Sequence, residues 1–238
     1  MQLNSFTTEV APTDAWHLLS PKMSPQRRSK LEAVAAARSA YLRLVLQDVH
    51  DPHNIGACLR SAEAFGVQHV DLINVQQKFG KPSSVARGAR YWLDMHRFNS
   101  IPTYLAALRE AGYALAAAYP AQDAVRVDEI PIDRPLAIVF GNEHAGLHPD
   151  WNAHIDYRFT IPMYGMVESF NISVSVALTL FTLQERCRKD LAPARFFLPA
   201  AERLALLNRW ACQQSQDAPR ELERLRALLQ QEGGSGSS

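Results

Sequence analysis

The stretch IPMYGMVESFNISVSVALTLF, Ile161 to Phe181, joins two kinds of sequence. Its first half contains Pro162, Gly165 and Asn171, which are typical of a bent loop. Its second half is a run of small and apolar residues, which predicts a buried helix beginning near Ile172. An ordinary packing helix does not need so specified a loop, so this loop is a candidate for a functional site.

Strands alternate with helices through the rest of the chain. The predicted strands cover residues 41–49, 69–75, 114–119, 136–141 and 157–163, and the predicted helices between them include 54–66 and 101–113. The segment 136–141 is apolar throughout, as in a strand that is buried on both faces of a parallel sheet. This order predicts an α/β fold with a mostly parallel sheet.

The length and composition favour one large domain with helical additions. The chain has 238 residues, of which 47% are hydrophobic and 21% are charged. We expect a basic amino-terminal helical extension over residues 1–40, the α/β domain over 41–189, a helical carboxyl-terminal extension over 190–232, and a flexible tail over 233–238.

The number of cysteines and the length of the apolar segments indicate the compartment in which the protein works. The three cysteines contain no CxxC pair and are odd in number, so neither a zinc site nor a disulfide framework is indicated. The sequence has no apolar run of the roughly 18 residues that a membrane span needs, and MQLNSFTTEV does not resemble a secretory signal. We therefore expect a cytoplasmic protein with no metal and no membrane partner.

Two basic segments are candidates for binding nucleic acid. The first contains Arg27, Arg28 and Lys30, and the second, KFGKPSSVARGARYW, contains Lys81, Arg87 and Arg90 among aromatic residues. Cations bind a phosphate backbone, and aromatic rings stack on unpaired bases. A solvated helix face remains the alternative for either segment taken alone.

The first predicted strand is followed by DPHNIGACLRSAEAFG, which lacks the G-x-G-x-x-G signature of a dinucleotide-binding domain. Gly56, Arg60 and Glu63 instead share one face of the next predicted helix, and Asn54 is predicted to cap it. A capping asparagine and a surface ion pair would explain the same residues without a functional site.

A second cluster follows the buried strand in IVFGNEHAGL. Gly141, Asn142, Glu143 and Gly146 come after the carboxyl end of this strand, where open α/β sheets bind ligands. A turn with a capping acid is the alternative interpretation.

Taken together, the three clusters resemble the motifs of the SPOUT superfamily, and of its SpoU/TrmH family of RNA 2′-O-methyltransferases in particular. The matching segments are Asn54-x-Gly56-x-x-x-Arg60, FGNE-x-x-GL from Phe140 to Leu147, and IPM-x-GMVESFN-x-SV-x-x-AL from Ile161 to Leu178. The resemblance covers residues 31–189. It implies a carboxyl-terminal trefoil knot, a homodimer, and S-adenosylmethionine as the methyl donor.

The resemblance also implies roles for individual residues. It makes Arg60 the catalytic arginine, with four polar companions, and it puts cofactor contacts largely on backbone groups. The companions are Asn54, Glu143, Ser169 and Asn171, and the cofactor contacts are Ala118, Gly141, Ile161 and Phe170. A guanidinium has no acceptor site, so Arg60 as a base and Arg60 as an electrostatic stabiliser both stay open.

The terminal helices resemble those of the family's tRNA branch, which methylates guanosine 18 in the D-loop. The expected function is therefore 2′-O-methylation of tRNA at that nucleotide. Ribosomal RNA or another tRNA nucleotide is the nearest alternative, and an RNA-binding protein without catalysis is an alternative of another class. Glu168 stands where we expect a glutamine, and Ala86–Trp92 differs from the usual tRNA-branch segment.

Overall fold

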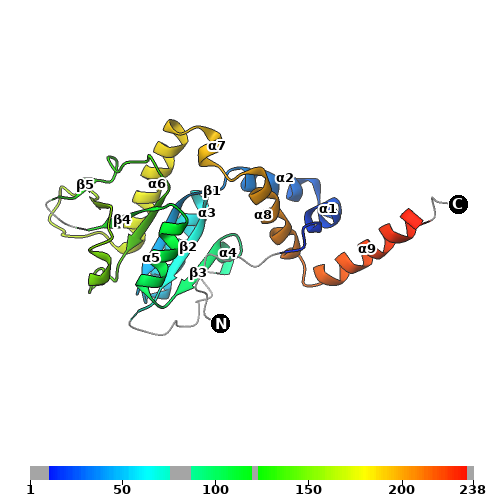
Figure 1. Ribbon diagram of the computed structural model, residues 1–238, viewed down its shortest axis with the longest axis horizontal. Coiled ribbons are helices and arrows are strands. Elements are labelled where there is room, and N and C mark those ends of the chain that lie inside the picture. Colours follow the sequence, from blue (N-terminus) through cyan, green and yellow to red (C-terminus); the bar gives the residue numbers. More distant parts are fainter. Residues whose placement is uncertain (1–10, 76–86, 120–122, 235–238) are drawn as a thin grey trace. The chain divides into compact units, whose positions relative to one another are not determined.

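The computed structural model describes residues 11–75, 87–119 and 123–234, which form two compact units (Figure 1). Of the described residues, the first unit contains 39–197, and the second contains 11–38 and 198–234. Within the described ranges, no helix is long and apolar enough to cross a membrane.

The first unit is built on a seven-stranded sheet in which all neighbouring strands are parallel, in the order β3-β2-β1-β6-β4-β7-β5. The strands are β1 (Ser39–Gln47), β2 (Val67–Ile73), β3 (Asp94–Phe98), β4 (Ala114–Ala118), β5 (Val125–Arg126), β6 (Leu136–Phe140) and β7 (Tyr157–Thr160). The predicted α/β class with a parallel sheet is confirmed.

Helices cover both faces of this sheet, which makes three layers. Helices α3 (Pro52–Ala64), α6 (Ile172–Asp190) and α7 (Pro193–Phe196) pack on one face. Helix α5 (Ile101–Glu110) and the turn η3 (Pro149–Trp151) pack on the other, and the short helix α4 (Arg87–Arg90) precedes β3. The central strands are therefore buried on both sides, as their apolar sequences predict.

The amino-terminal ends of helices α3 and α6 carry Asn54 and Asn171, two of the predicted site residues. Helix α3 is capped by Asp51, whose carboxylate accepts a hydrogen bond from the backbone N–H of His53 at 2.8 Å. The prediction that Asn54 is the cap is wrong, because Pro52 starts the helix two residues earlier. Asn54 consequently lies inside the first turn, where its amide can reach other loops. Helix α6 is capped by Asn171, whose side chain accepts a hydrogen bond from the backbone N–H of Ser173 at 2.8 Å.

The second unit consists of α1 (Ala15–Leu19), η1 (Ser20–Lys22), α2 (Pro25–Ala36), α8 (Ala200–Cys212) and α9 (Ala218–Gly234). Segments from the two ends of the chain pack together within it. The backbone N–H of Trp16 donates to Asn208 at 2.7 Å, and Arg27 donates to the Gln214 side chain at 2.6 and 2.9 Å. Residues 11–38 and 198–234 thus form one helical unit.

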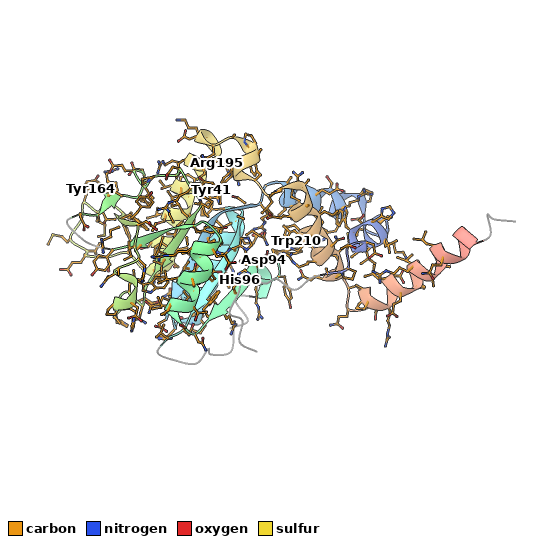
Figure 2. The ribbon with its side chains drawn as sticks, viewed as in Figure 1. Tyr41, Asp94, His96, Tyr164, Arg195 and Trp210 are labelled. Carbon is orange, nitrogen blue, oxygen red and sulfur yellow. The ribbon has the colours of Figure 1, made fainter. Side chains whose placement is uncertain are left out.

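A buried ionic cluster lies in the sheet on the side of α5. The Arg43 guanidinium donates two hydrogen bonds of 2.8 Å to Asp71, which also contacts His96 at 3.0 Å and Tyr104 at 2.9 Å. Figure 2 labels His96 on β3, away from Tyr164. Burial would raise the pKa of Asp71, but the charge and hydrogen bonds of Arg43 lower it to about 2. The cluster is a structural ion pair inside the sheet.

Candidate functional site

The carboxyl ends of β1, β6, β4 and β7 are adjacent in the sheet, since these strands are parallel neighbours in that order. Three motif segments start at this edge. Asn54 follows β1, Glu143 follows β6, and the Ile161–Asn171 loop follows β7. Segments far apart in sequence therefore meet at the edge where open parallel sheets bind ligands.

A chain of side-chain hydrogen bonds connects the three motifs. The Asn54 amide donates to Oε1 of Glu143 at 2.8 Å and accepts from the Asn171 amide at 3.1 Å. Oδ1 of Asn171 then accepts from the backbone N–H of Ser173 at 2.8 Å and from its hydroxyl at 2.6 Å. All donors point the same way, toward the Glu143 carboxylate. The chain therefore ends in a charge-assisted hydrogen bond, which is stronger than a neutral one.

The segment that carries Glu143 is a tight turn. The backbones of Asn142 and Gly146 exchange hydrogen bonds of 3.0 and 2.9 Å, and Gly146 has a φ of +68°. The Asn142 side chain accepts from the backbone N–H groups of His144 and Ala145, each at 2.9 Å. These bonds close the turn and hold Glu143 at its tip.

Arg60 and Ser169 are not joined to this chain of hydrogen bonds. Arg60 lies two turns into α3 with an exposed side chain, and Ser169 is exposed in the loop before α6. In the described part of the molecule, no hydrogen bond or ion pair links either side chain to Asn54, Glu143 or Asn171. An exposed guanidinium is accessible to a phosphate or a developing oxyanion.

Three of the four predicted cofactor residues lie at adjacent strand ends. Ala118 ends β4, Gly141 follows β6, and Ile161 follows β7, in the middle of the sheet order. Ala118 and Ile161 are half-buried, and Phe170 is partly exposed beside the cap of α6. Apolar side chains of this kind can pack against a flat adenosyl group, and backbone donors and acceptors can bind its polar edge.

The predicted RNA-binding residues have different surroundings. Arg27 is half-buried and is engaged with Gln214, and Arg28 pairs with Glu32 at 3.2 Å. Lys30 and Arg90 are exposed. Arg87 begins α4, and Lys81 lies outside the described residues.

The sequence assigns no individual role to several residues that hold the site. Ser173 extends the hydrogen-bond chain, and Asn142 closes the Glu143 turn. Gln47 and Asp48, at the end of β1, are bonded to the same turn. Asn142 stands inside a recognised motif, but nothing in the sequence around Gln47 and Asp48 identifies them.

The Glu143 carboxylate also affects the core beneath it. Burial raises the pKa of the Cys58 thiol to about 12, and the nearby charge of Glu143 adds to that rise. Cys58 is therefore a neutral packing residue of α3 rather than a nucleophile.

The loop between β7 and α6 is largely exposed. Tyr164, labelled in Figure 2, and Met166 have 91% and 99% of their surfaces accessible, and Glu168 is exposed as well. Glu168 therefore faces solvent and lies outside the chain of hydrogen bonds that contains Asn171.

Comparison with known proteins identifies relatives over most of the chain. Residues 41–181 match the family model described as the SpoU rRNA Methylase family. A tRNA (guanosine(18)-2′-O)-methyltransferase of Escherichia coli is 32% identical over 187 residues, which are 78% of this chain and 82% of the relative. A 23S rRNA (guanosine-2′-O-)-methyltransferase of Nitrosomonas europaea is 37% identical over 144 residues, which are 59% and 54% of the two chains.

Many solved structures are similar to this one, among them the following two. The TrmH/SpoU tRNA modifying enzyme of Aquifex aeolicus superimposes with a TM-score of 0.71 at 25% identity, over 79% of this chain and 96% of that one. The SpoU methyltransferase AviRb of Streptomyces viridochromogenes, in complex with AdoMet, has a TM-score of 0.56 at 27% identity, over 64% and 62% of the two chains.

Proposed function

This chain belongs to the SpoU rRNA methylase family, and we propose that it methylates the ribose 2′-hydroxyl of guanosine 18 in tRNA with S-adenosylmethionine as the donor. The observation that carries the proposal is the hydrogen-bond chain Glu143–Asn54–Asn171, which assembles one polar residue from each motif at the ligand-binding edge of the sheet. A relative named for this reaction aligns over 78% of the chain.

The cofactor would be held by backbone groups at Ala118, Gly141 and Ile161, with Phe170 against its apolar surface. When bound, S-adenosylmethionine supplies a methyl group on a positively charged sulfur. The loops would orient that group and exclude water from it. Positioning of this kind contributes roughly 7–11 kcal/mol to a transfer between two bound reactants.

Arg60 would act on the RNA as a cation. A guanidinium has no acceptor site, so it would bind the phosphate next to the target ribose and stabilise the developing negative charge on the 2′-oxygen. The Asn54 and Asn171 amides, fixed by Glu143, would orient the hydroxyl. Phosphate or solvent would take the proton.

An assay with matched substrates tests this function. The protein is incubated with labelled S-adenosylmethionine and an unmodified tRNA transcript, and with the same tRNA carrying 2′-deoxyguanosine at position 18. We expect incorporation into the first RNA only, because the second lacks the acceptor hydroxyl. Equal incorporation into both would refute the assignment to guanosine 18.

Ribosomal RNA is a second candidate substrate, because the Nitrosomonas relative named for 23S rRNA shares the higher identity of 37% over a shorter segment. Unmodified ribosomal RNA in a parallel reaction distinguishes the two. Binding of the cofactor without methylation of either RNA would instead favour an RNA-binding protein without catalysis.

We also propose that the protein is a homodimer through the outer face of α6. Val174, Leu178 and Phe181 lie on one stripe of this helix and expose 43%, 39% and 53% of their surfaces. An apolar stripe on a helix that starts at the site fits a second copy of the chain. Leu178→Asp should give monomers in light scattering and Leu178→Met dimers. A dimeric Leu178→Asp protein would refute this interface.

The family's trefoil knot belongs to the same proposal, with the segment between β7 and α6 threaded through a loop. The similarity to the Aquifex structure, at a TM-score of 0.71, supports this topology. A tRNA substrate also implies a cytoplasmic enzyme.

The helical unit is proposed to contact the RNA backbone through Arg28 and Lys30. Arg27 is less informative, since its substitution also removes the bond to Gln214. Exchanging Arg28 and Lys30 for glutamine should weaken RNA binding and reduce its salt dependence, with cofactor affinity unchanged. An RNA affinity equal to wild type would mean that this face is only solvated.

A further inference from the structure

Two polar residues at the end of β1, the last strand residue and the residue after it, are almost completely buried. Gln47 and Asp48 expose only 2% and 1% of their surfaces. Among the residues that the structure describes, Asp48 is also the one non-glycine residue with a positive φ, at 48°. A left-handed conformation at a buried aspartate persists only where the surrounding bonds fix it.

Those bonds join Asp48 to two neighbouring parts of the sheet. Its carboxylate accepts from the backbone N–H of Val75 at 2.9 Å, and its own N–H donates to the carbonyl of Ile73 at 2.8 Å. Its carbonyl accepts from the Asn142 side chain at 2.9 Å. One residue therefore links the end of β2 to the turn that carries Glu143.

Gln47 completes the connection at the other end of that turn. Its amide nitrogen donates to the second Asp48 carboxylate oxygen at 2.6 Å, and its amide oxygen accepts from the backbone N–H of His148 at 2.8 Å. The segment from Asn142 to His148 is therefore bonded to the end of β1 at both of its ends, with Glu143 between them.

We propose that Gln47 and Asp48 are positioning residues for the methyl transfer, because they fix Glu143 at the distance from α3 at which it holds Asn54. The inference rests on the proposed function, since the reaction gives the positioning its consequence. The residues act through Asn142 and the turn. A purely structural role for the same bonds would lower stability and leave the transfer rate unchanged.

The hydrogen-bond pattern allows a pair of substitutions that distinguishes a positioning role from a purely structural one. In Asp48→Asn the side-chain oxygen must face Val75, so the new amide nitrogen faces Gln47. Both that nitrogen and the backbone N–H of His148 are donors, and Gln47 has only one amide oxygen facing them, so it can accept from one of the two but not from both. Adding Gln47→Glu restores both bonds, because a carboxylate accepts from each donor. Asparagine also tolerates the left-handed conformation, so the backbone preference is retained.

The experiment compares wild type, Asp48→Asn and the double variant Gln47→Glu/Asp48→Asn. Transfer rates are measured in single turnover at saturating cofactor and RNA, with melting temperature and amide hydrogen exchange of residues 142–148 as further readouts. We expect Asp48→Asn to slow transfer by at least about tenfold and to speed exchange. The double variant should return to within about threefold of wild type in both.

Two results would overturn the proposal. One is a folded Asp48→Asn protein with wild-type transfer, whether or not the hydrogen exchange of residues 142–148 changes. The other is a double variant that regains the melting temperature but not the transfer rate. If Asp48→Asn does not fold, recovery of folding and rate together in the double variant supports the proposal, and recovery of folding alone overturns it.

Failure of the proposed function has a different signature. If wild type methylates a different nucleotide, the same comparison is made on that RNA. If wild type methylates no RNA, the reaction assignment fails. Amide hydrogen exchange of residues 142–148 then decides whether Gln47 and Asp48 position the turn. Unchanged hydrogen exchange in Asp48→Asn would show that they do not.

Discussion

Replacing Gly141 by alanine tests whether the Glu143 turn must close tightly. An added Cβ would lie 2.4 Å from both the carbonyl carbon and the carbonyl oxygen of Gly146, and 2.6 Å from the backbone nitrogen of Leu147. These are backbone atoms, so no side-chain rotation relieves the overlap. Because ordinary contacts begin near 3.4 Å, the returning segment must move by about 1 Å.

That movement acts on the site through the turn. Asn142 and Gly146 exchange hydrogen bonds of 3.0 and 2.9 Å, and a shift of about 1 Å takes both beyond normal range. Glu143 is carried on the displaced segment. A misplacement of about 1 Å can cost about 100-fold in rate, whereas overpacking typically costs about 1–3 kcal/mol of stability. We therefore expect a folded protein with methyl transfer slowed by about 100-fold.

The assay is single-turnover methyl transfer to tRNA, with folding checked by circular dichroism and melting temperature. Gly88→Ala is the matched control, because no neighbouring atom lies within 4 Å of its added Cβ. At saturating RNA, where a change in RNA affinity does not affect the rate, the control should transfer at the wild-type rate. A folded Gly141→Ala protein with wild-type transfer would falsify the tight-turn requirement.

Three further predictions concern charge and burial. Glu143→Gln keeps an acceptor for Asn54 but loses the charge, so we expect transfer to slow by about tenfold in single turnover without a change in folding. The folded-state pKa of Asp71, near 2, lies below its ordinary value, so its stabilising contribution is present above about pH 4 and disappears as the pH falls toward 2. Asp71→Asn leaves the Arg43 charge buried and should cost about 3–5 kcal/mol in urea unfolding at neutral pH, and the difference from wild type should shrink by roughly 2 kcal/mol between pH 4 and pH 2. Cys58 should resist thiol reagents in the native protein and react on unfolding, because burial raises its pKa to about 12.

The parallel sheet could be predicted because its signals are local. Apolar strand sequences such as Leu136–Phe140 alternate with helical periods, and that alternation alone favours an α/β fold. The strand order could not be predicted, since β6 lies between β1 and β4 through contacts across about 90 residues of sequence. The cap of α3 was also missed, because Asp51 and Asn54 are equally good capping types and only the position of Pro52 distinguishes them.

The motifs predict which residues belong to the candidate site, but not how their atoms are arranged. The motifs contain Asn54, Glu143 and Asn171, and the structure joins them by hydrogen bonds between residues 89 and 117 positions apart. Which atom donates to which is a property of the folded loops. The motif likewise predicts a role for Arg60 but not its contacts. Over the described ranges, its exposed side chain makes no hydrogen bond to the other three motif residues.

The residues that sequence reasoning missed have a common physical reason. Gln47 and Asp48 continue a strand of apolar residues, and at that position a buried polar pair is unfavourable unless every donor and acceptor is satisfied. Their partners are mostly backbone groups of Ile73, Val75 and His148, which any sequence supplies. When a side chain bonds to backbone groups, the sequence contains no complementary side chain that would indicate the contact. Residue types therefore predict candidate reactive groups for this site, while the groups that hold the Glu143 turn in place emerge only from the fold.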